Sequence, residues 1–246
     1  MYGEALVKCA AMQPCYLPWL GHLRLMALVD HFVFLDDAQY SKNSWHNRNR
    51  VLLSDGKISW LTIPISKNGL STPINKVKID ADPRWRRKHA QTLRHSYGHH
   101  PYFADLMELI DLIENGTQGV LADLNCDLLQ LAASRCGIFS KIEKSSALPV
   151  IGQRTERLER LCHYYGCETY ISTPGAREYL EADLFGMNTS LQLGYMDIEF
   201  SPYSQKGLSA FIPQLSFVDA LANVGWNGVS ELILSKGGKH ARDTHF

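Results

Sequence analysis

Short apolar runs and a helical pattern alternate at the start of the chain. Residues 6–12 are mostly apolar and are typical of a buried strand, as are residues 31–35. Between them, the apolar residues of 20–29 fall mostly at helical spacing. A strand, about ten residues of helix and a second strand indicate a βαβ unit, with parallel strands and a right-handed crossover.

The pattern changes in the middle of the chain. Two apolar runs, 51–53 and 58–65, flank the turn pair Asp55-Gly56 and predict an antiparallel hairpin. Residues 74–79 alternate apolar and polar, which predicts a half-exposed strand. Helical apolar stripes follow, and they indicate core packing; the helices are predicted at about 82–97, 101–115 and 117–136.

The α/β alternation then returns. We predict strands over 138–142, 169–172 and 196–200, and helices over 155–165 and 216–224. Thr155 is the expected N-cap of the first of these helices, and Gly166 its C′ residue. The sequence therefore predicts an α/β fold with a mostly parallel, Rossmann-like sheet. The hairpin and helical segment at about 51–136 form an insertion within a single domain, 1–246.

Composition narrows the classes of function. Lys plus Arg equals Asp plus Glu, 25 against 25, so no global field attracts nucleic acid or an anionic membrane. No apolar run approaches the ~20 residues of a membrane span, and no signal peptide is recognisable. None of the six cysteines is spaced as CxxC, which favours free thiols over disulfides or zinc. We expect a soluble, cytoplasmic protein.

Four predicted strands end in polar or Gly/Pro-bearing segments. Ligands of open parallel sheets bind at the carboxyl ends of the strands. Those ends are predicted at residues 13–16, 36–39, 145–146 and 172–175. We expect these segments to converge on a polar pocket.

The stretch MQPCYLPWLGH follows the first predicted strand. Pro14 and Pro18 disfavour helical geometry in the residues before them, so the chain makes a defined detour before its helix. Gly21 beside Trp19 would allow close backbone approach, and free N–H groups at the helix start suit an anion. The alternative is a rigid turn with packed aromatics. The run WLGH is similar to the His-x-Gly-His signature of the HUP-group nucleotidylyl transferases, with Trp19 in place of the first histidine.

A polar stretch follows the second predicted strand. Asp36 and Asp37 are adjacent and face opposite ways on a strand, which disfavours a metal pair. After them come Lys42, His46, Arg48 and Arg50, with Trp45 among them. This cluster suits phosphate, carboxylate or nucleotide binding. The alternative is a solvated loop whose asparagines serve turn geometry.

Other candidates carry less information. The basic run 84–95 indicates a solvated helix face or, alternatively, a contact with RNA phosphates or an anionic substrate. His99-His100 has the wrong spacing for a zinc site. Cys15 is the one thiol expected near the pocket, but no orienting histidine can be placed beside it. Arg177 is expected to face the strand ends, where it suits an anion or belongs to a plain loop.

Four blocks spread along the chain carry a family resemblance: MQPCYLPWLG, DDAQYSKNSWHNRNRV, YISTPGAREYL and PQLSFVDALANVG. Together they resemble the WbqC-like protein family, named for a member encoded among bacterial O-antigen genes. The family pattern has an aromatic residue at the position of His22, so His22 is not expected to be a general catalytic residue. The gene association implies modification of a nucleotide-linked sugar, by acylation or aminoacylation of an amino group.

Our hypothesis is a transferase or ligase that acts on a nucleotide-activated or aminoacyl-activated substrate. We expect no metal ligands, and the candidate cofactor is a nucleotide or a nucleotide-linked donor. The alternative is a non-catalytic module that binds a nucleotide sugar or an RNA such as tRNA. Candidate catalytic residues are Asp36, Lys42 and His46. Candidate binding residues are Gln13, Tyr16, Trp19, Gly21, Gln39, Trp45, Asn47, Arg48, Arg50, Gly175, Arg177 and Tyr179.

Overall fold

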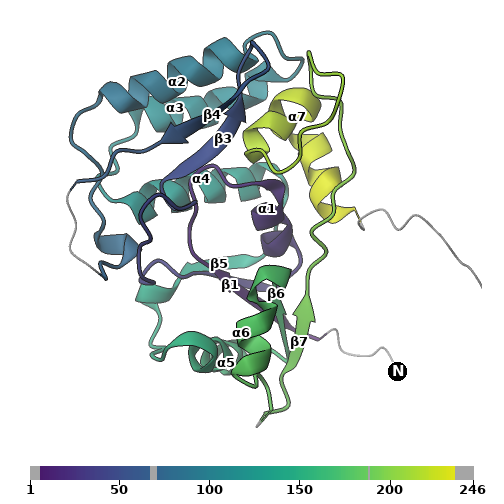
Figure 1. Cartoon of the computed structure of the whole chain (residues 1–246). Coiled ribbons are helices and arrows are strands. Elements are labelled where there is room, and N and C mark those ends of the chain that lie inside the picture. The colour runs from purple at the N-terminus through teal and green to yellow at the C-terminus, as the bar shows by residue number, and fades with distance from the viewer. Residues whose placement is uncertain (1–5, 67–70, 188, 236–246) are drawn as a thin grey trace, which may run out of the picture.

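A parallel sheet forms the centre of the lower half of the molecule in Figure 1. The computed structural model describes residues 6–66, 71–187 and 189–235. Within these residues, a five-stranded sheet has the order β5-β2-β1-β6-β7, and all neighbouring strands are parallel. The strands are β1 (Lys8–Met12), β2 (His31–Phe34), β5 (Lys141–Lys144), β6 (Thr169–Ser172) and β7 (Gln192–Tyr195). The predicted α/β fold with a mostly parallel, Rossmann-like sheet is confirmed.

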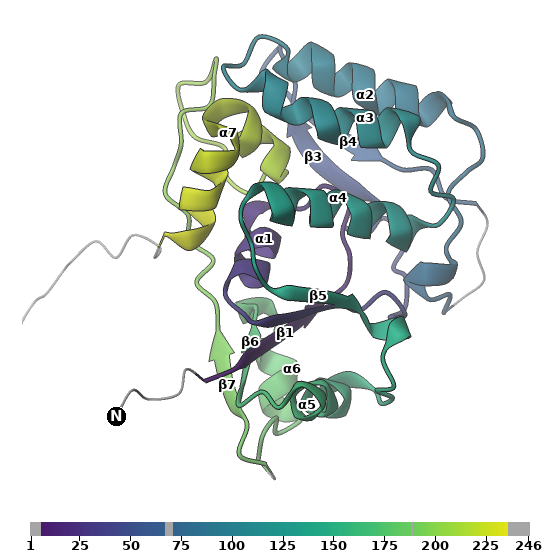
Figure 2. The ribbon, with the colours of Figure 1, turned by 180° about the vertical axis from the view of Figure 1, so that it is seen from behind.

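Helices cover both faces of this sheet. On one face lie α1 (Leu20–Ala27), α4 (Leu121–Arg135) and α7 (Phe217–Leu234), and on the other α5 (Arg154–Tyr165) and α6 (Arg177–Ala182) (Figures 1 and 2). The chain moves outward from β1 through β2 to β5, then returns past β1 to β6 and β7. Right-handed crossovers in opposite directions place their helices on opposite faces. The direction therefore reverses between β1 and β6, which is the topological switch point.

The middle of the chain forms a second layer over the helices. It contains the antiparallel hairpin of β3 (Arg48–Leu52) and β4 (Ile58–Thr62), together with α2 (Arg84–Tyr97), the 3₁₀ turn Phe103–Leu106 and α3 (Met107–Asn115). In both views this layer lies beyond α1 and α4, away from the sheet (Figures 1 and 2). The predicted hairpin and helices are present.

Two predicted strands are wrong. Residues 74–79 contain a 3₁₀ turn, Ile74–Lys76, because the backbone N–H groups of Ile74 and Asn75 donate to the carbonyls of Ala38 and Asp36. Residues 196–200 follow β7 instead of forming a strand. There the Arg24 guanidinium donates to the carbonyls of Asp197 and Glu199 at 2.8 and 2.7 Å. These bonds take the place of those that a neighbouring strand would donate.

Two helix ends also differ from prediction. The N-cap of α5 is Gln153, and the hydroxyl of Thr155 instead donates to Asp183 at 2.7 Å. Gly166 caps the other end with φ 66°, as predicted. At Gly225 the backbone leaves helical geometry with φ 70°, but α7 continues beyond this kink.

The predicted free thiols are found as such: none of the six cysteines forms a disulfide, five are buried and Cys15 is half-buried. Across the described ranges, no helix combines the length and apolar character that crossing a bilayer requires.

Candidate functional site

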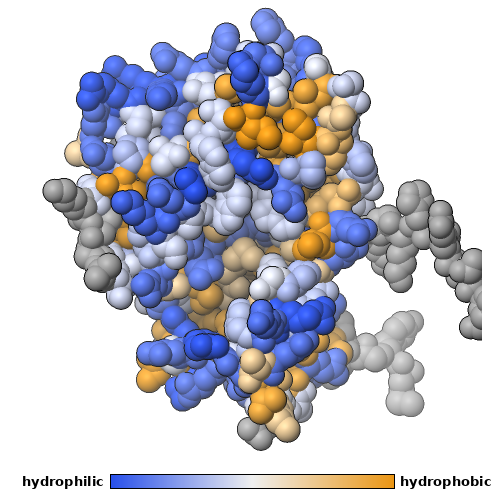
Figure 3. All heavy atoms as spheres, in the orientation of Figure 1, coloured by the Kyte–Doolittle hydropathy of each residue, from blue (hydrophilic) through white to orange (hydrophobic). Residues whose placement is uncertain are grey.

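A pocket of about 430 Å³ opens at the switch point, where β1 and β6 end. Figure 3 shows the molecule hollowed on this face, between α6 and the layer that carries the hairpin. The walls of the pocket come from four segments: the loop after β1 with the start of α1, the loop before β3, the turn after β6, and the connection after β7. The lining residues are Met12, Gln13, Cys15, Pro18, Trp19, His22, Ser44, Trp45, His46, Asn49, Thr173, Pro174, Gly175, Ile198 and Gln214.

The loop after β1 is held in a strained conformation. Leu17 is a buried, non-glycine residue with φ 41°, and it directly precedes Pro18. The Asn49 side-chain amide donates to the carbonyls of Leu17 at 2.8 Å and Tyr16 at 3.2 Å. The Tyr16 amide in turn donates to the carbonyl of Trp45 at 3.0 Å. These bonds fix the detour that the prolines predict.

Asn125 of α4 joins two walls of the pocket. It is fully buried, and its side-chain amide donates to the carbonyls of Pro14 at 3.0 Å and His46 at 2.8 Å. One side chain therefore sets the distance between the loop after β1 and the loop before β3. Sequence reasoning missed it, because in sequence Asn125 is a polar position within a helical apolar stripe.

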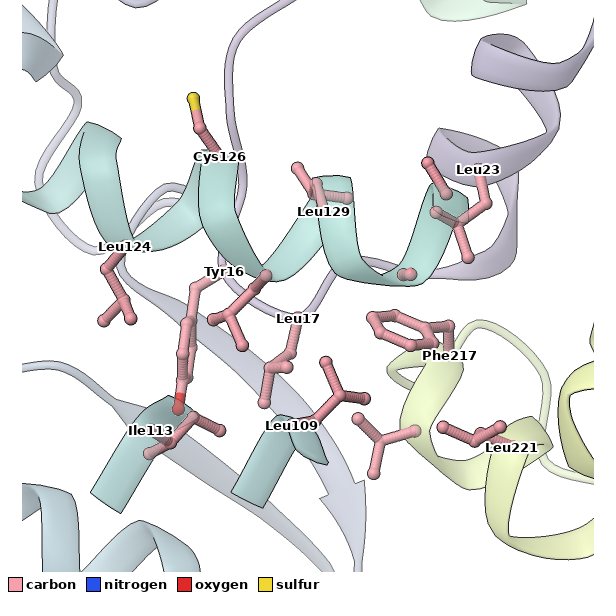
Figure 4. Packing of buried hydrophobic residues seen from close by; sticks show 14 of the residues in the cluster. Tyr16, Leu17, Leu23, Leu109, Ile113, Leu124, Cys126, Leu129, Phe217 and Leu221 are labelled. Carbon is pink, nitrogen blue, oxygen red and sulfur yellow. The ribbon is translucent and has the colours of Figure 1, made fainter. Parts of the chain in front are cut away.

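Tyr16 lies outside the pocket, although the sequence predicts a binding role. Its side chain and that of Leu17 point into the apolar core between α3, α4 and α7 (Figure 4). The Tyr16 hydroxyl lies 2.9 Å from Nδ1 of His89 on α2. Burial raises the pKa of Tyr16 and lowers the pKa of His89 to about 4, so both groups are neutral at neutral pH. The pair anchors the strained loop to the inserted layer.

The start of α1 faces the pocket. Trp19 is the N-cap residue, and no side chain caps the helix there. The first N–H groups of a helix lack helical partners, but here the His22 N–H already donates to the carbonyl of Trp19 at 3.1 Å. Gly21 does not line the pocket itself; it makes room for Trp19. A Cβ at position 21 would lie 2.3 Å from Cζ2 of the Trp19 indole.

His22 belongs to the pocket wall, although the family resemblance gives it no general catalytic role. The residue is 1% exposed, and its Nε2 has no hydrogen-bond partner among the described residues. Its ring packs against Phe32 and Phe34, with centroid distances of 5.9 and 6.4 Å. Burial lowers the pKa of His22 to about 3 and keeps the imidazole neutral.

His46 lies in the opposite wall and is also neutral. Its Nδ1 accepts a hydrogen bond from the backbone N–H of Ser41 at 3.3 Å, and burial lowers its pKa to about 4. A neutral imidazole that accepts at Nδ1 carries its proton on Nε2. His46 is therefore arranged to donate a hydrogen bond from Nε2.

Asp36 is placed away from the pocket by its own hydrogen bonds. Its carboxylate accepts from Ser146 N at 2.9 Å, Ser146 Oγ at 2.5 Å, Ser145 Oγ at 3.1 Å and Asn75 Nδ2 at 3.3 Å. With its acceptor positions occupied in this way, it fastens the end of β2 to the end of β5.

Asp37 pairs with Arg157 at 2.6 and 2.9 Å. Burial opposes the charge of Asp37, but the bonds from Arg157 and Ser145 outweigh it, so the Asp37 pKa is lowered. Of the four predicted strand ends, only those of β1 and β6 meet in the pocket. The ends of β2 and β5 bond to each other instead.

The predicted basic cluster lies mostly at the rim. Trp45 lines the pocket and is 49% exposed, and Lys42 is exposed. Arg50 donates to the Gln214 carbonyl at 3.0 Å, and the Arg48 guanidinium lies 4.4 Å from the centroid of the Trp60 ring.

Two further candidates of this stretch lie outside the pocket. Asn47 is buried and donates to the carbonyl of Ile63 at 3.0 Å. Gln39 is exposed and forms an isolated β-bridge with Pro73. Neither side chain lines the pocket.

Of the candidates after β6, Gly175 lines the pocket, whereas Arg177 and Tyr179 do not. The Arg177 guanidinium lies 3.9 Å from the centroid of the Tyr195 ring at the end of β7. Cys15 lies in the pocket wall, where burial raises the pKa of its thiol to about 12. The thiol is therefore protonated at neutral pH, which disfavours a nucleophilic role.

The basic run on α2 is not one solvated face. Trp85, Arg86 and His89 are buried, and Arg86 donates to the carbonyls of Ile113 and Gln118 at 2.9 and 2.7 Å. Arg94 pairs with Glu114 at 2.5 Å. Most of the positive charge needed for an RNA contact is thus already engaged. Groups of His, Cys, Asp and Glu arranged to hold a metal ion are absent from the part of the chain that the structure describes.

Fold and pocket together define a doubly wound α/β protein with a ligand-sized pocket at its topological switch point. The model of the WbqC-like protein family matches residues 13–231, and the chain belongs to this family. It is also 33% identical over 221 residues to "Uncharacterized protein Rv1507c" of Mycobacterium tuberculosis (strain ATCC 25618 / H37Rv), covering 89% of this chain and 94% of the relative. No solved structure matches the chain.

Proposed function

We propose that the protein is a cytoplasmic transferase or ligase that acts on a nucleotide-activated or aminoacyl-activated substrate. The observation that supports it best is the switch-point pocket itself, whose wall includes the buried and unpaired Nε2 of His22. A volume of about 430 Å³ suits one small molecule. The six free cysteines agree with a reducing compartment.

In this proposal the pocket stabilises negative charge through neutral donors. The N–H groups at the start of α1 face an anionic group of the substrate, such as a phosphate or a developing oxyanion. His46 donates from Nε2 on the other side. The indoles of Trp19 and Trp45 supply flat apolar walls.

The acceptor in this proposal is the amino group of a sugar used in surface polysaccharides, as the gene association of the family implies. Both carboxylate oxygens of Asp36 already accept hydrogen bonds, so we do not assign it a contact with the amine. We assign that contact to His22, because its buried Nε2 is unpaired. The role of His22 is to orient the amine by a hydrogen bond.

A thermal-shift screen of nucleotides, nucleotide sugars and aminoacyl-adenylate analogues tests the proposal. A ligand that binds the folded state raises the melting temperature, and the Trp19→Ala variant should lose that increase. Phe139, which is 97% exposed, provides a matched control, since Phe139→Ala should keep it. If no compound in the screen raises the melting temperature, the proposal fails.

One observation favours a second function, a non-catalytic module that binds a nucleotide sugar. The described pocket residues include no carboxylate, and the pKa values of His22 and His46 are about 3 and 4, too low for efficient bases near neutral pH. Such a module would bind the screened ligand tightly but would produce no new compound with any amino-sugar acceptor. Mass spectrometry of the incubated mixture separates the two functions.

A further inference from the structure

Two half-exposed tryptophans and two arginines form one surface beside the pocket. We call it the hairpin platform; it consists of Trp45, Arg48, Arg50 and Trp60. Trp45 and Trp60 are 49% and 44% exposed, and their ring centroids lie 5.4 Å apart. The Arg48 guanidinium lies 4.4 Å from the Trp60 centroid, and that of Arg50 lies 5.9 Å from the Trp45 centroid.

The geometry of the hairpin puts these side chains on its outer face. Arg50 pairs with Trp60 across the strands, and Arg48 lies two residues before Arg50 on the same side. The residue between them, Asn49, points inward and is buried. The strand period therefore places Arg48, Arg50 and Trp60 on one face, and Trp45 joins them from the loop before β3 through its ring contact with Trp60.

The positive charge of the platform has no paired carboxylate among the residues that the structure describes. Within the described ranges, neither Arg48 nor Arg50 forms an ion pair, and the Nε atoms of both are buried without a hydrogen-bond partner. Elsewhere, Arg94, Arg135 and Arg157 each pair with a carboxylate. Unpaired guanidinium groups beside exposed indoles fit a ligand that carries both an anionic group and an aromatic ring.

The platform is continuous with the pocket. The Trp45 indole belongs to both, and Arg50 donates to the carbonyl of Gln214, another pocket residue. The pocket and the platform are therefore adjacent, and they share Trp45.

We infer that the hairpin platform binds the nucleoside diphosphate part of the activated substrate, while the transferred group occupies the switch-point pocket. The base stacks on Trp60 and Trp45, and Arg48 and Arg50 face the phosphates. This inference rests on the proposed function and narrows its substrate to a nucleoside diphosphate conjugate. It assigns specificity for the carrier to Trp60 and Arg48, which lie outside the pocket.

Calorimetric titration with ADP, GDP, CDP, UDP and pyrophosphate tests the inference. We expect at least one nucleoside diphosphate to bind more tightly than pyrophosphate. Trp60→Ala should weaken that binding about tenfold or more, whereas Trp60→Phe should restore most of it. Arg48→Gln should weaken both pyrophosphate and the nucleotide.

Two matched controls lie close by. Ile58→Ala removes another exposed apolar side chain from β4, and Arg87→Gln removes an exposed charge from α2. Both variants should bind the nucleotide like the wild type. Each variant is also compared with the wild type by circular dichroism, so that a folding defect is recognised.

The outcomes separate this inference from the proposed function. If a nucleotide binds and Trp19→Ala weakens it while Trp60→Ala does not, the platform is excluded and the pocket proposal stands. If no nucleoside diphosphate binds at millimolar concentration, the inference is overturned, and aminoacyl-activated ligands in the thermal-shift screen decide the proposed function. If a ten-residue oligouridylate binds more than a hundredfold more tightly than UDP, with a steep salt dependence, the platform is an RNA surface and the inference fails.

Discussion

The Trp19 indole lies against the backbone of Gly21, where a Cβ would come within 2.3 Å of its Cζ2 atom. In an ordinary helix, changing Gly to Ala stabilises the protein by about 1 kcal/mol. Here Gly21→Ala should instead displace the indole from the pocket wall and weaken ligand binding about tenfold or more, the scale of a lost stacking contact. Near-ultraviolet circular dichroism reports the movement of Trp19, and calorimetry reports the affinity.

Gly119 supplies the control for this substitution, because a Cβ there would meet nothing within 4 Å. Gly119→Ala should leave both the spectrum and the affinity unchanged. A Gly21→Ala variant with native spectrum and native affinity would show that the close approach does not shape the pocket.

Replacing Asp36 by Asn should destabilise the protein without weakening ligand binding. Both carboxylate oxygens accept hydrogen bonds, so an amide NH₂ would face the donors of Ser145, Ser146 or Asn75. A buried mismatch of this kind costs about 1–3 kcal/mol in the free energy of unfolding. Urea denaturation measures it, with Glu178→Gln at an exposed position of α6 as the control. Unchanged stability with lost turnover would return Asp36 to the catalytic role of the original hypothesis.

The sheet and its helices were largely predictable from sequence, because the burial of a strand or helix face imposes a regular spacing on its apolar residues. The strands at 74–79 and 196–200 were wrong because long-range partners override the local pattern. In the second case Arg24, far away in sequence, takes the carbonyls that a strand would pair. Alternation alone cannot show whether a neighbouring strand exists.

The site was predicted only in part. The rule for strand ends located Gln13, Cys15 and Gly175 in the pocket, because it depends only on topology. The rule could not exclude Asp36 or Tyr16 from the pocket. The directions of their side chains are set by hydrogen bonds with Ser146 and His89, which lie in distant segments. The place of His22 in the pocket wall was not predicted, because a comparison of residue types does not show which ring nitrogen lacks a hydrogen-bond partner.

Asn125→Leu should loosen the pocket and destabilise the protein. The leucine has the same branching and the same number of side-chain heavy atoms as the asparagine, but it leaves the carbonyls of Pro14 and His46 without their donor in a buried position. We expect a loss of about 1–3 kcal/mol per carbonyl in the free energy of unfolding, together with weaker ligand binding. Asn115→Leu at the exposed end of α3 is the control. Native stability in Asn125→Leu would show that the two walls hold together without this bridge.

The thiol of Cys15 should react slowly with alkylating reagents despite its place in the pocket wall. Burial raises its pKa to about 12, so almost none of it is thiolate at pH 7.5. We expect iodoacetamide to leave the Cys15 peptide unmodified in the folded protein and to modify it in urea, as peptide mass spectrometry can show. Cys15→Ser should retain turnover with the substrate that the screen identifies. Rapid alkylation of folded protein, or loss of turnover in Cys15→Ser, would favour a nucleophilic thiol instead.

The stability of the protein should fall as the pH drops below about 6.5, the ordinary histidine pKa. His22, His46 and His89 are buried, and burial lowers their pKa values to about 3, 4 and 4 in the folded state. Between pH 6.5 and 5 the unfolded chain therefore binds protons that the folded chain does not. Each histidine then reduces the free energy of unfolding by up to about 1.4 kcal/mol per pH unit. Urea denaturation at pH 7.5, 6.0 and 5.0 measures the slope, and His22→Phe should lower it by about one proton. A stability that stays constant from pH 7.5 to 5.0, or a slope unaffected by His22→Phe, would contradict the burial of neutral imidazoles beside this pocket.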